Sequence, residues 1–385
     1  MQDSIWFRTL PRELRDSLQQ STELPGDASF VIVGAGMVGL LTAYYLTEAG
    51  ANNICVIDRS TVLGEASGSN AGGLWFAQQS REMGTLSSLV KKTRQLYEEL
   101  DERFDFDLRK PGMLQLCFTS KEASQRSTIV KTVNKAGFRA ESISAKQVGE
   151  LEPKLQKPTR GAVFYPDEGC LHPGRLAARL AHYLREKEVT FALGVTVETL
   201  APQIETNQGT ISAGTTIVTT GAWTPLLTEV LNWRPPIKPM RGTLMATEPI
   251  RHTLNHTIMT PNFYYWQLPE GHIAGGGSVE DVGFRRGVDE KTTSSIRNEM
   301  NELLPSVARR SETCCWSGFR PYCEDAKPVV GLVPGQKNMF VGAGHFKKGI
   351  MMAPVTGKIL AELATQGKTR LAIRSLSPSR FRLKK

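Results

Sequence analysis

The pattern of apolar positions is most informative at residues 30–46, where a strand-like run leads into glycines and then into a segment of helical composition. Residues 31–33 are β-branched and predict a buried strand, and residues 34–39 follow at once with the spacing G-x-G-x-x-G. Glycines so placed permit a tight turn, let the backbone approach a pyrophosphate and pack the helix on the strand. A second strand-like run at residues 53–57 ends on Asp58, whose carboxylate can accept hydrogen bonds from a ribose. The stretch predicts a dinucleotide site.

Helical and strand-like patterns alternate over residues 86–223. Residues 86–104 have the apolar spacing of a helix, and residues 172–184 predict another helix whose leucines recur every four positions. Residues 215–223 resemble a buried strand that ends on glycine, as expected where a strand meets a cofactor. Further strands are expected at residues 113–118, 161–166, 189–200 and 210–219.

The sequence pattern changes at residues 235–319, where strand-like runs and glycines predict an antiparallel sheet. The aromatic cluster at residues 263–266 fits either the core of that sheet or the wall of a substrate pocket. A strand at residues 339–341 then leads into a second glycine turn at 342–350 and a helical segment at 353–363. A second helix N-terminus directed at the same ligand suits a large anionic cofactor.

Glycine and small polar residues dominate the segment 64–75, which we expect not to form one regular element. Such a loop suits close approach of the backbone to a planar ring or a phosphate. The alternative is a solvent-exposed linker, which the apolar residues 74–76 disfavour.

The two ends of the chain differ from its middle. Residues 1–28 are mostly polar, but Leu10, Leu14 and Leu18 lie four apart around Pro11, which predicts a short amphipathic helix. We expect this helix to pack on its own domain, with an arm for a partner subunit as the alternative. The last eighteen residues contain four arginines, three lysines and no acid, which indicates a solvated basic tail or a contact with an anionic partner or membrane surface.

Composition is that of a globular protein of two domains. The chain has 385 residues, of which 40% are hydrophobic and 22% charged. A net charge of +9 favours anionic ligands, yet the cations are scattered outside the tail, which disfavours nucleic acid binding. The six cysteines show no CxxC or zinc spacing, so reduced thiols, no metal and a cytoplasmic location are expected. Three glycines within residues 30–46 argue against a transmembrane span there, although peripheral contact with the inner face of the membrane stays open.

Five motifs in this order resemble the FAD-dependent amino acid oxidase superfamily, whose members include D-amino-acid, glycine and sarcosine oxidases. The motifs are VIVGAGMVG with Asp58, the loop SGSNAGG, the strand ending TTGAW, the segment from GFRP to Gly331, and GAGHFKKGI. The resemblance covers residues 29–372. The AGGLW at residues 71–75 also resembles the flavin subunits of hydrogen cyanide synthase and opine dehydrogenase complexes.

The fold class implied is mixed α/β and α+β, with a Rossmann-like FAD-binding domain and a second, largely antiparallel-sheet substrate domain. The FAD-binding domain is expected to be discontinuous, over residues 29–105, 160–235 and 320–372. Residues 106–159 and 236–319 are expected to form the substrate domain. An N-terminal extension at residues 1–28 and a basic tail at residues 373–385 complete the chain.

The resemblance implies non-covalently bound FAD, with the pyrophosphate at residues 34–39 and the ribose on Asp58. The isoalloxazine is expected near residues 70–74, with its pyrimidine end at residues 344–350. The backbone near Val197 is expected to contact the adenine. The implied cofactor-binding residues are Gly34, Ala35, Gly36, Met37, Val38, Gly39, Asp58, Arg59, Ser69, Asn70, Ala71, Gly72, Gly73, Leu74, Val197, Gly221, Trp223, Gly344, His345, Lys347, Lys348, Gly349 and Ile350.

The chemistry implied belongs to the flavin. A deprotonated amine gives a hydride from its α-carbon to flavin N5, and the resulting imine hydrolyses to an oxo-acid. No catalytic side chain is expected, so the absence of an obvious acid–base pair does not argue against an enzyme.

Arg320 matches the family arginine that holds the substrate carboxylate, which a guanidinium can bind through two parallel hydrogen bonds. The alternative is a structural arginine. Lys347 stands where the family often has a second arginine, and a lysine there points to a different carboxylate position or a larger substrate. Tyr264 and Tyr265 fit a substrate pocket as well as a core. Cys323 lies near, but not at, the position that bonds flavin covalently in sarcosine oxidases, hence the expected dissociable FAD.

Three functions are compatible with these residues. The leading one is oxidation of a C–N bond in a small amino acid or N-alkyl amino acid, with oxygen or a quinone-like acceptor. The second is the flavin subunit of a heteromeric opine- or glycine-oxidising complex that passes electrons to a partner subunit. A non-catalytic or NAD-binding module is disfavoured by the second glycine turn at residues 342–350. A homo-oligomer stays open.

Overall fold

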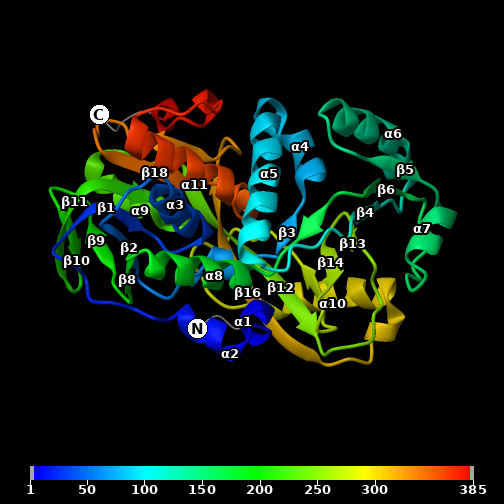
Figure 1. Ribbon diagram of the computed structural model, residues 1–385. Helices are drawn as coiled ribbons and strands as arrows, with labels where there is room; N and C mark the ends of the chain where they lie inside the picture. The colour runs from blue at the N-terminus through cyan, green and yellow to red at the C-terminus, as the bar shows by residue number, and fades with distance from the viewer. Residues whose placement is uncertain (1–3, 382–385) are drawn as a thin grey trace.

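The computed structural model describes residues 4–381, except for the side chains of residues 81–83 and 85, and contains two large sheets (Figure 1). The expected fold class is confirmed. The first sheet has the order β17 (Val329–Leu332), β18 (Met339–Ala343), β11 (Gly209–Val218), β1 (Asp27–Val33), β2 (Ile54–Asp58) and β8 (Thr190–Leu193), with β9 (Val197–Thr199) and β10 (Ile204–Thr206) attached to β11. Its central pairs are parallel, and β17 is antiparallel to β18.

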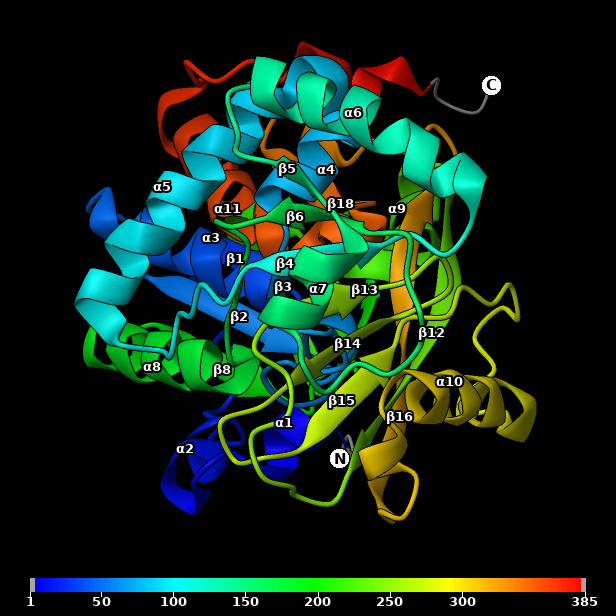
Figure 2. The same cartoon turned by 90° about the vertical axis from the view of Figure 1, so that its right-hand side faces the viewer.

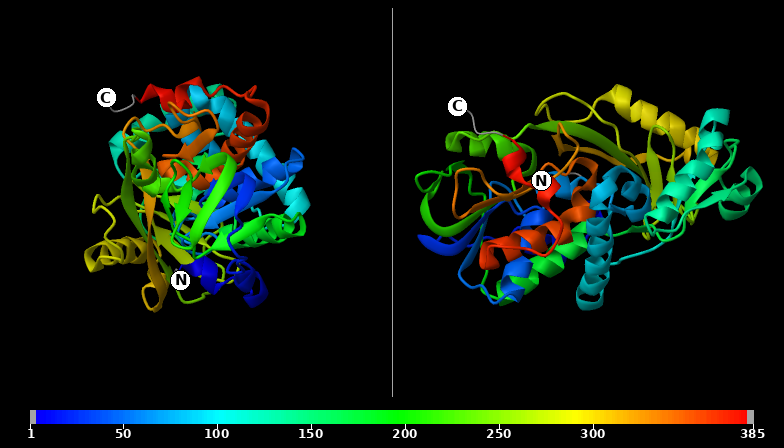
Figure 3. Two further views of the ribbon diagram at one scale, coloured as in Figure 1. Left: turned by 90° about the vertical axis from the view of Figure 1, so that its left-hand side faces the viewer. Right: turned by 90° about the horizontal axis from the view of Figure 1, so that it is seen from above.

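The second sheet is antiparallel except where β13 meets β4, which agrees with the expectation for residues 235–319. Its order is β16 (Glu312–Cys323), β12 (Ile237–Thr247), β15 (Ile273–Gly276), β14 (Tyr264–Gln267), β13 (Thr257–Met259), β4 (Met113–Leu116), β6 (Ala162–Tyr165) and β5 (Glu141–Ile143). A two-stranded sheet joins β3 (Gly73–Leu74) to β7 (Gly169–Cys170). Seen from above, the two large sheets occupy opposite halves of an elongated molecule (Figure 3).

Helices cover both sheets, and α10 lies beside β16 and β12 (Figure 2). In the part of the chain that the structure describes, no helix is long and apolar enough to cross a membrane. The helices are α1 (Ile5–Arg8), α2 (Arg12–Ser17), α3 (Met37–Glu48), α4 (Phe76–Met83), α5 (Ser87–Phe104), α6 (Ser120–Lys135), α7 (Ala145–Leu151), α8 (Pro173–Glu186), α9 (Thr224–Thr228), α10 (Glu290–Leu303) and α11 (Gly349–Gln366).

Alternation along β1 explains why the first sheet is buried on both faces. Ile32 packs into the core that α3, α8 and α11 form on one face, whereas Val31 and Val33 pack into the core on the other face with Trp233. All four side chains are at most 4% exposed. A run of consecutive apolar residues is typical of a parallel strand covered on both sides.

The elements expected at residues 86–104, 172–184 and 353–363 correspond to α5, α8 and α11, with shifted ends. The prediction of one amphipathic helix in the N-terminal segment is wrong, because the segment forms two short helices, α1 and α2. Pro11 directly precedes α2, but Leu10 and Leu18 are buried on either side of that helix and Leu14 alone lies within it. These leucines pack against the first sheet's helical face, as expected for a segment that packs on its own chain.

The predicted FAD-binding domain includes β6 and the end of β16, although both strands belong to the second sheet. β6 follows residue 160, yet it pairs with β4 and β5. β16 runs continuously past residue 320 and pairs with β12 along its length. The two sheets therefore divide the chain at other positions than the motif-based boundaries do.

Helices α3 and α11 pack closely against each other on one face of the first sheet. A Cβ added to Gly357 would lie 2.6 Å from the carbonyl carbon of Leu41 and 2.8 Å from the amide nitrogen of Thr42. A Cβ on Gly342, at the end of β18, would lie 2.7 Å from the Leu360 side chain. Glycine at these positions lets the two helices and the strand approach closely, which brings the N-termini of α3 and α11 together.

Gly357→Ala is expected to lower the free energy of unfolding by about 1–3 kcal/mol, because backbone atoms of Leu41 and Thr42 leave no room for the methyl group. Urea unfolding of the apoprotein measures this change. Gly149→Ala is the matched control, since Gly149 lies in α7 with nothing within 4 Å of an added Cβ. That variant should gain up to about 1 kcal/mol from helix propensity. Equal stability changes in the two variants would contradict the packing argument.

His345 ties the second glycine turn to α11, since its Nε2 lies 2.9 Å from Thr356 Oγ1. Burial lowers the pKa of His345 to about 4, so the unfolded chain binds this proton more readily between that value and the ordinary pKa of about 6.5. The apoprotein should therefore lose stability as pH falls through this window, by up to about 1.4 kcal/mol per pH unit from this residue. Thermal unfolding against pH should show a shallower slope for His345→Gln, which keeps a polar partner for Thr356. If the stability of His345→Gln and of the unaltered protein changes with pH at the same slope, the pH dependence does not come from His345.

Candidate functional site

Two connected cavities lie where the first sheet faces the second. The Asp58 cavity is lined by Asp58 and Val197, and the Arg320 cavity is lined by Arg320 and Ile350. Both cavities are lined by Gly36, Ala66, Ser67, Thr219 and Gly221. The sharing of these residues makes one extended site that crosses the carboxyl ends of β1 and β11. That is where ligands bind in open α/β sheets.

The first glycine turn is fixed by close backbone contacts. A Cβ added to Gly39 would lie 1.9 Å from the carbonyl oxygen of Gly34, so α3 packs directly on the end of β1. Gly34 has φ +116°, a left-handed conformation, and faces Thr219. The Thr219 hydroxyl donates to the Gly34 carbonyl at 3.0 Å. The N-cap residue of α3, Gly36, has no side chain to cap the helix, and a helix N-terminus of this kind suits a phosphate.

Asp58 lines its cavity and also holds the glycine turn. Its carboxylate accepts hydrogen bonds from the backbone amides of Ala35 and Ser60, each at 2.8 Å. Burial raises the pKa of Asp58, while these amides and Arg59 oppose the rise. The Arg59 guanidinium lies 4.0 Å over the Trp223 ring, which forms another wall of the cavity.

The loop at residues 66–74 separates the two cavities. Its Ser67 hydroxyl accepts a hydrogen bond from the Met37 amide at 3.1 Å, at the N-terminus of α3. The side chain of Asn70 accepts from the Gly72 amide at 2.5 Å and donates to the Ser67 carbonyl. Ser69 and Asn70 line the Arg320 cavity with Ala71 and Gly73. The loop therefore presents polar groups while its own hydrogen bonds hold it in shape.

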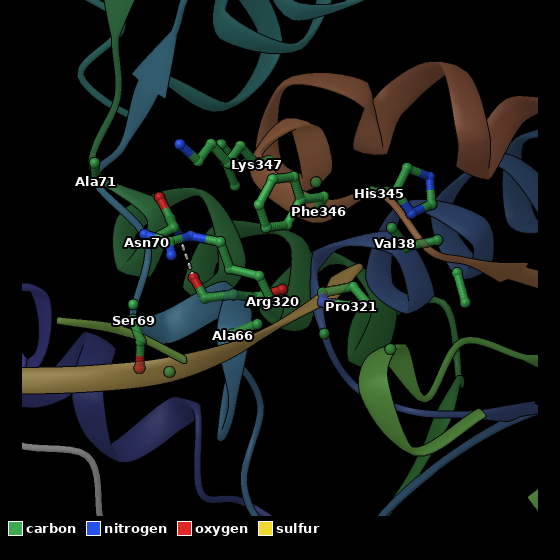
Figure 4. Close-up of a pocket in the computed structure, with 18 of the residues that line it drawn as sticks. Val38, Ala66, Ser69, Asn70, Ala71, Arg320, Pro321, His345, Phe346 and Lys347 are labelled. Atoms are coloured by element: carbon green, nitrogen blue, oxygen red, sulfur yellow. Dashed lines mark hydrogen bonds between the residues drawn. The ribbon is translucent and has the colours of Figure 1, made fainter. Parts of the chain in front are cut away.

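Arg320 lies on β16, where Gly242 leaves space for its guanidinium and Gly318 leaves space for Ser69 of the loop. Its guanidinium donates to the Ser278 carbonyl at 2.6 Å, and a Cβ added to Gly242 would lie 2.0 Å from Arg320 Nη1. A Cβ on Gly318 would lie 2.6 Å from the Ser69 side chain. Gly242 and Gly318 face each other in the ladder between β12 and β16. They bring the half-buried guanidinium against the loop, as the close-up shows with Asn70 nearby (Figure 4).

Arg241, one strand away, shows what a structural arginine looks like in this sheet. Its side chain is fully buried and is bound by the carboxylates of Glu280 and Asp289. For Arg320, by contrast, no carboxylate of the described residues lies within ion-pair distance, and none of the residues lining its cavity is acidic. The structure therefore supports a binding role for Arg320 over the structural alternative.

The second glycine turn closes the Arg320 cavity from the other side (Figure 4). Phe346 and Lys347 line it, and Gly349 and Ile350 bring the uncapped N-terminus of α11 to it. Lys347 is exposed, whereas Lys348 is buried and does not line the cavity. Two cations and a helix N-terminus thus face the same space, which suits an anionic ligand.

The aromatic cluster divides between pocket and core because adjacent residues of a strand point to opposite faces. Tyr264 lines the Arg320 cavity and meets the Trp75 ring edge-on, with centroids 4.6 Å apart. Tyr265 has no exposed surface, and its hydroxyl donates to the Ile296 carbonyl at 3.2 Å. The expectation that Tyr265 lines the substrate pocket is corrected, since it packs in the core beneath α10.

Most residues predicted for the site line one of the two cavities. The Arg320 cavity contains Gly36, Val38, Ser69, Asn70, Ala71, Gly73, Gly221, Tyr264, Arg320, His345, Lys347, Gly349 and Ile350. The Asp58 cavity contains Gly34, Gly36, Asp58, Arg59, Val197, Gly221 and Trp223. Eight predicted residues line neither cavity, namely Ala35, Met37, Gly39, Gly72, Leu74, Tyr265, Gly344 and Lys348. The side chains of Met37 and Leu74 lie in the hydrophobic core, so they could reach a cofactor through backbone atoms alone.

Several lining residues were not identified from the sequence. Thr219 precedes the TTGAW glycine and could have been found from that motif. Gly242 and Gly318 follow from no local signal, because their role depends on the ladder between two distant strands. Trp75, which follows the loop at residues 66–74, and Phe346, in the second glycine turn, also line the Arg320 cavity.

The shape and the donor set fit an extended anionic dinucleotide with a flat ring. The α3 end and Asp58 would hold a pyrophosphate and a ribose, and the loop with the α11 end would hold the ring. Within the described residues no group of His, Cys, Asp and Glu could hold a metal ion.

Comparison with known proteins gives the same result. The family described as FAD dependent oxidoreductase matches residues 29–363. A glycine oxidase from Geobacillus kaustophilus is 26% identical over 365 residues, covering 91% of this chain and 96% of that protein. Hydrogen cyanide synthase subunit HcnC from Pseudomonas aeruginosa is 25% identical over 399 residues, covering 91% and 95%. The solved glycine oxidase structure from Geobacillus kaustophilus has a TM-score of 0.86 at 24% identity, covering 93% of this chain and all of that one.

The family match spans nearly the whole chain and includes every element that forms the two cavities. The resemblance seen in the five sequence motifs is therefore confirmed. The chain belongs to the family of FAD-dependent oxidoreductases.

Proposed function

We propose that the protein oxidises the C–N bond of a small amino acid or N-alkyl amino acid to an imine, which hydrolyses to an oxo-acid. FAD, when bound, would supply the oxidising power for this reaction as a hydride acceptor. The observation that carries the proposal is Arg320, a half-buried guanidinium in a cavity that no acidic residue lines. A carboxylate is the group that such a fork binds best.

The side chains of the Arg320 cavity orient the substrate. The bond from Arg320 to the Ser278 carbonyl restricts the guanidinium before a substrate arrives, which lowers the entropy cost of binding. Tyr264 and Trp75 form an apolar wall beside it. His345 is buried and its lowered pKa keeps it neutral, and no carboxylate lines the cavity in the described residues. The reacting amine is therefore expected to lose its proton to water.

Cys323 supports the proposal that FAD is held without a covalent bond. Its thiol has no exposed surface, lies in the core of the first sheet and lines neither cavity. We also propose a cytoplasmic location, which agrees with six cysteines that form no disulfide.

A second candidate is a flavin subunit that passes electrons to a partner subunit. The similarity to the HcnC subunit over 91% of this chain favours it. Stopped-flow kinetics of the purified chain separates the two candidates. Fast flavin reduction by an amino acid, followed by reoxidation with oxygen or a quinone over many turnovers, supports the self-sufficient enzyme. Slow reoxidation with both acceptors supports the subunit.

Arg320→Ala is expected to lower kcat/KM for amino acids by about 10- to 150-fold, mainly through KM, because hydrogen bonds to a charged group contribute about 1.5–3 kcal/mol. Anaerobic flavin reduction against substrate concentration measures it. Arg320→Lys should recover only part of the loss, since a lysine lacks the fork. Arg139→Ala is the control, because Arg139 is an exposed arginine paired with Asp167. An unchanged apparent affinity in Arg320→Ala would refute the carboxylate role.

Lys347→Met tests whether the second cation reads a second carboxylate. The variant should lose about two- to fivefold in kcat/KM for an N-carboxymethyl amino acid, since an exposed ion pair contributes up to about 1 kcal/mol. It should leave the matching N-methyl amino acid unaffected. Lys358→Met serves as the control, because Lys358 lies on α11, the helix that follows Lys347, and pairs with Glu362. Equal losses for both substrates would show that Lys347 does not discriminate between them.

A further inference from the structure

The first helix of the chain is buried although it precedes the family match. Ile5, Trp6 and Phe7 of α1 are exposed by 0%, 2% and 7%, whereas the family match begins at residue 29. A segment of four helical residues cannot be stable alone, so its burial must come from contacts with the rest of the molecule. Those contacts converge on the loop that lines the Arg320 cavity.

Trp6 contacts that loop with both its polar and its apolar surface. Its indole nitrogen donates to the Asn70 carbonyl at 2.6 Å. A Cβ added to Gly72 would lie 3.0 Å from the Trp6 ring, so the loop backbone rests directly on the indole. Gly72 also has φ +69°, which a side chain would strain. The loop conformation and the position of Trp6 are therefore complementary.

A second tryptophan holds the preceding residue of the loop. Trp316 of β16 donates from its indole nitrogen to the Ser69 carbonyl at 3.3 Å. Two indoles thus bind two consecutive carbonyls from the buried side of the loop. The side chains of Ser69 and Asn70 remain on the side that lines the Arg320 cavity.

The aromatic cluster around Trp6 extends to Tyr264, which lines the Arg320 cavity. Trp6 stacks on Trp266 of β14, with centroids 6.3 Å apart and planes at 16°. Trp266 shares its face of β14 with Tyr264, and Tyr264 and Ala71 both pack against this cluster. A shift of α1 would therefore displace both the loop and Tyr264.

His172 fixes α1 from the other side. Its Nδ1 accepts from the Arg175 amide at 3.2 Å, so its Nε2 carries the proton and donates to the Thr9 hydroxyl at 3.1 Å. Burial lowers the pKa of His172 to about 3, which keeps this tautomer neutral. The Trp6 ring also meets His172 edge-on at 5.1 Å. The position of Trp6 is thus set by bonds at both ends of a single helical turn.

We propose that α1 is part of the flavin site and that Trp6 is a positioning residue, which holds the Asn70 carbonyl and thereby the loop that faces the flavin ring. The proposal rests on the placement of the ring at residues 69–74. It assigns the N-terminal extension a role in the site in place of a docking arm.

Trp6→Phe tests this, because it keeps an aromatic ring and removes the donor, whereas a smaller residue would leave a cavity. Loss of a buried hydrogen bond should weaken FAD binding to the apoprotein by about tenfold and change the visible circular dichroism of the bound flavin. Trp233→Phe is the matched control, since Trp233 is equally buried but lies in the core on the far face of the first sheet. It should leave both readouts unchanged.

These readouts need no substrate, so they are independent of the amine that the enzyme oxidises. Unchanged FAD affinity and circular dichroism in Trp6→Phe would overturn the role of Trp6, whatever the thermal stability of the variant. Gly73→Ala locates the ring separately, because Gly73 lines the cavity and an added Cβ would displace Trp75. If Gly73→Ala also leaves both readouts unchanged, the ring lies elsewhere and the proposal fails together with the placement.

Discussion

The close contact between α3 and α11 is the constraint on which the rest of the site depends. Gly357 allows α11 to pack on the backbone of α3 near Leu41. Gly342 allows the end of β18 to pack against α11. Because the two helices begin at the ends of parallel strands, this contact directs both N-termini at one cavity. The positive ends of two helix dipoles then favour a single large anion. No charged residue is needed to create this preference, since the backbone supplies it.

The second sheet adds selectivity to that cofactor-binding half. Its long ladder between β12 and β16 carries Gly242 and Gly318 as facing residues, and the missing side chains leave space for Arg320 over Gly242 and for Ser69 of the loop over Gly318. The same ladder carries Arg241 on its other face, where two carboxylates neutralise it. Neighbouring arginines of one sheet thus differ in role because of the face they occupy.

The sequence predicted elements whose signals are local, and it failed where the cause is distant. The glycine turn at residues 34–39, α5 and α8 were predictable, because apolar spacing and glycine position specify them directly. Tyr264 and Tyr265 could not be told apart, since the face of β14 that meets the cavity depends on how the whole sheet is oriented. Gly357 resembles any glycine within a helical pattern, and its importance arises only from α3. Trp6 lay in a mostly polar extension, and its partner is sixty-four residues away.

Arg320 and Arg241 differ in charge balance, which is the physical basis for proposing that only Arg320 binds a substrate. A guanidinium taken partly out of water loses hydration, and it must regain that energy from a partner. Arg241 regains it from Glu280 and Asp289, so nothing remains for a ligand. Arg320 has the Ser278 carbonyl, and no carboxylate of the described residues lies within ion-pair distance. Under the proposed function, a substrate carboxylate would supply the missing partner, whereas a neutral amine of similar shape would leave the guanidinium without one.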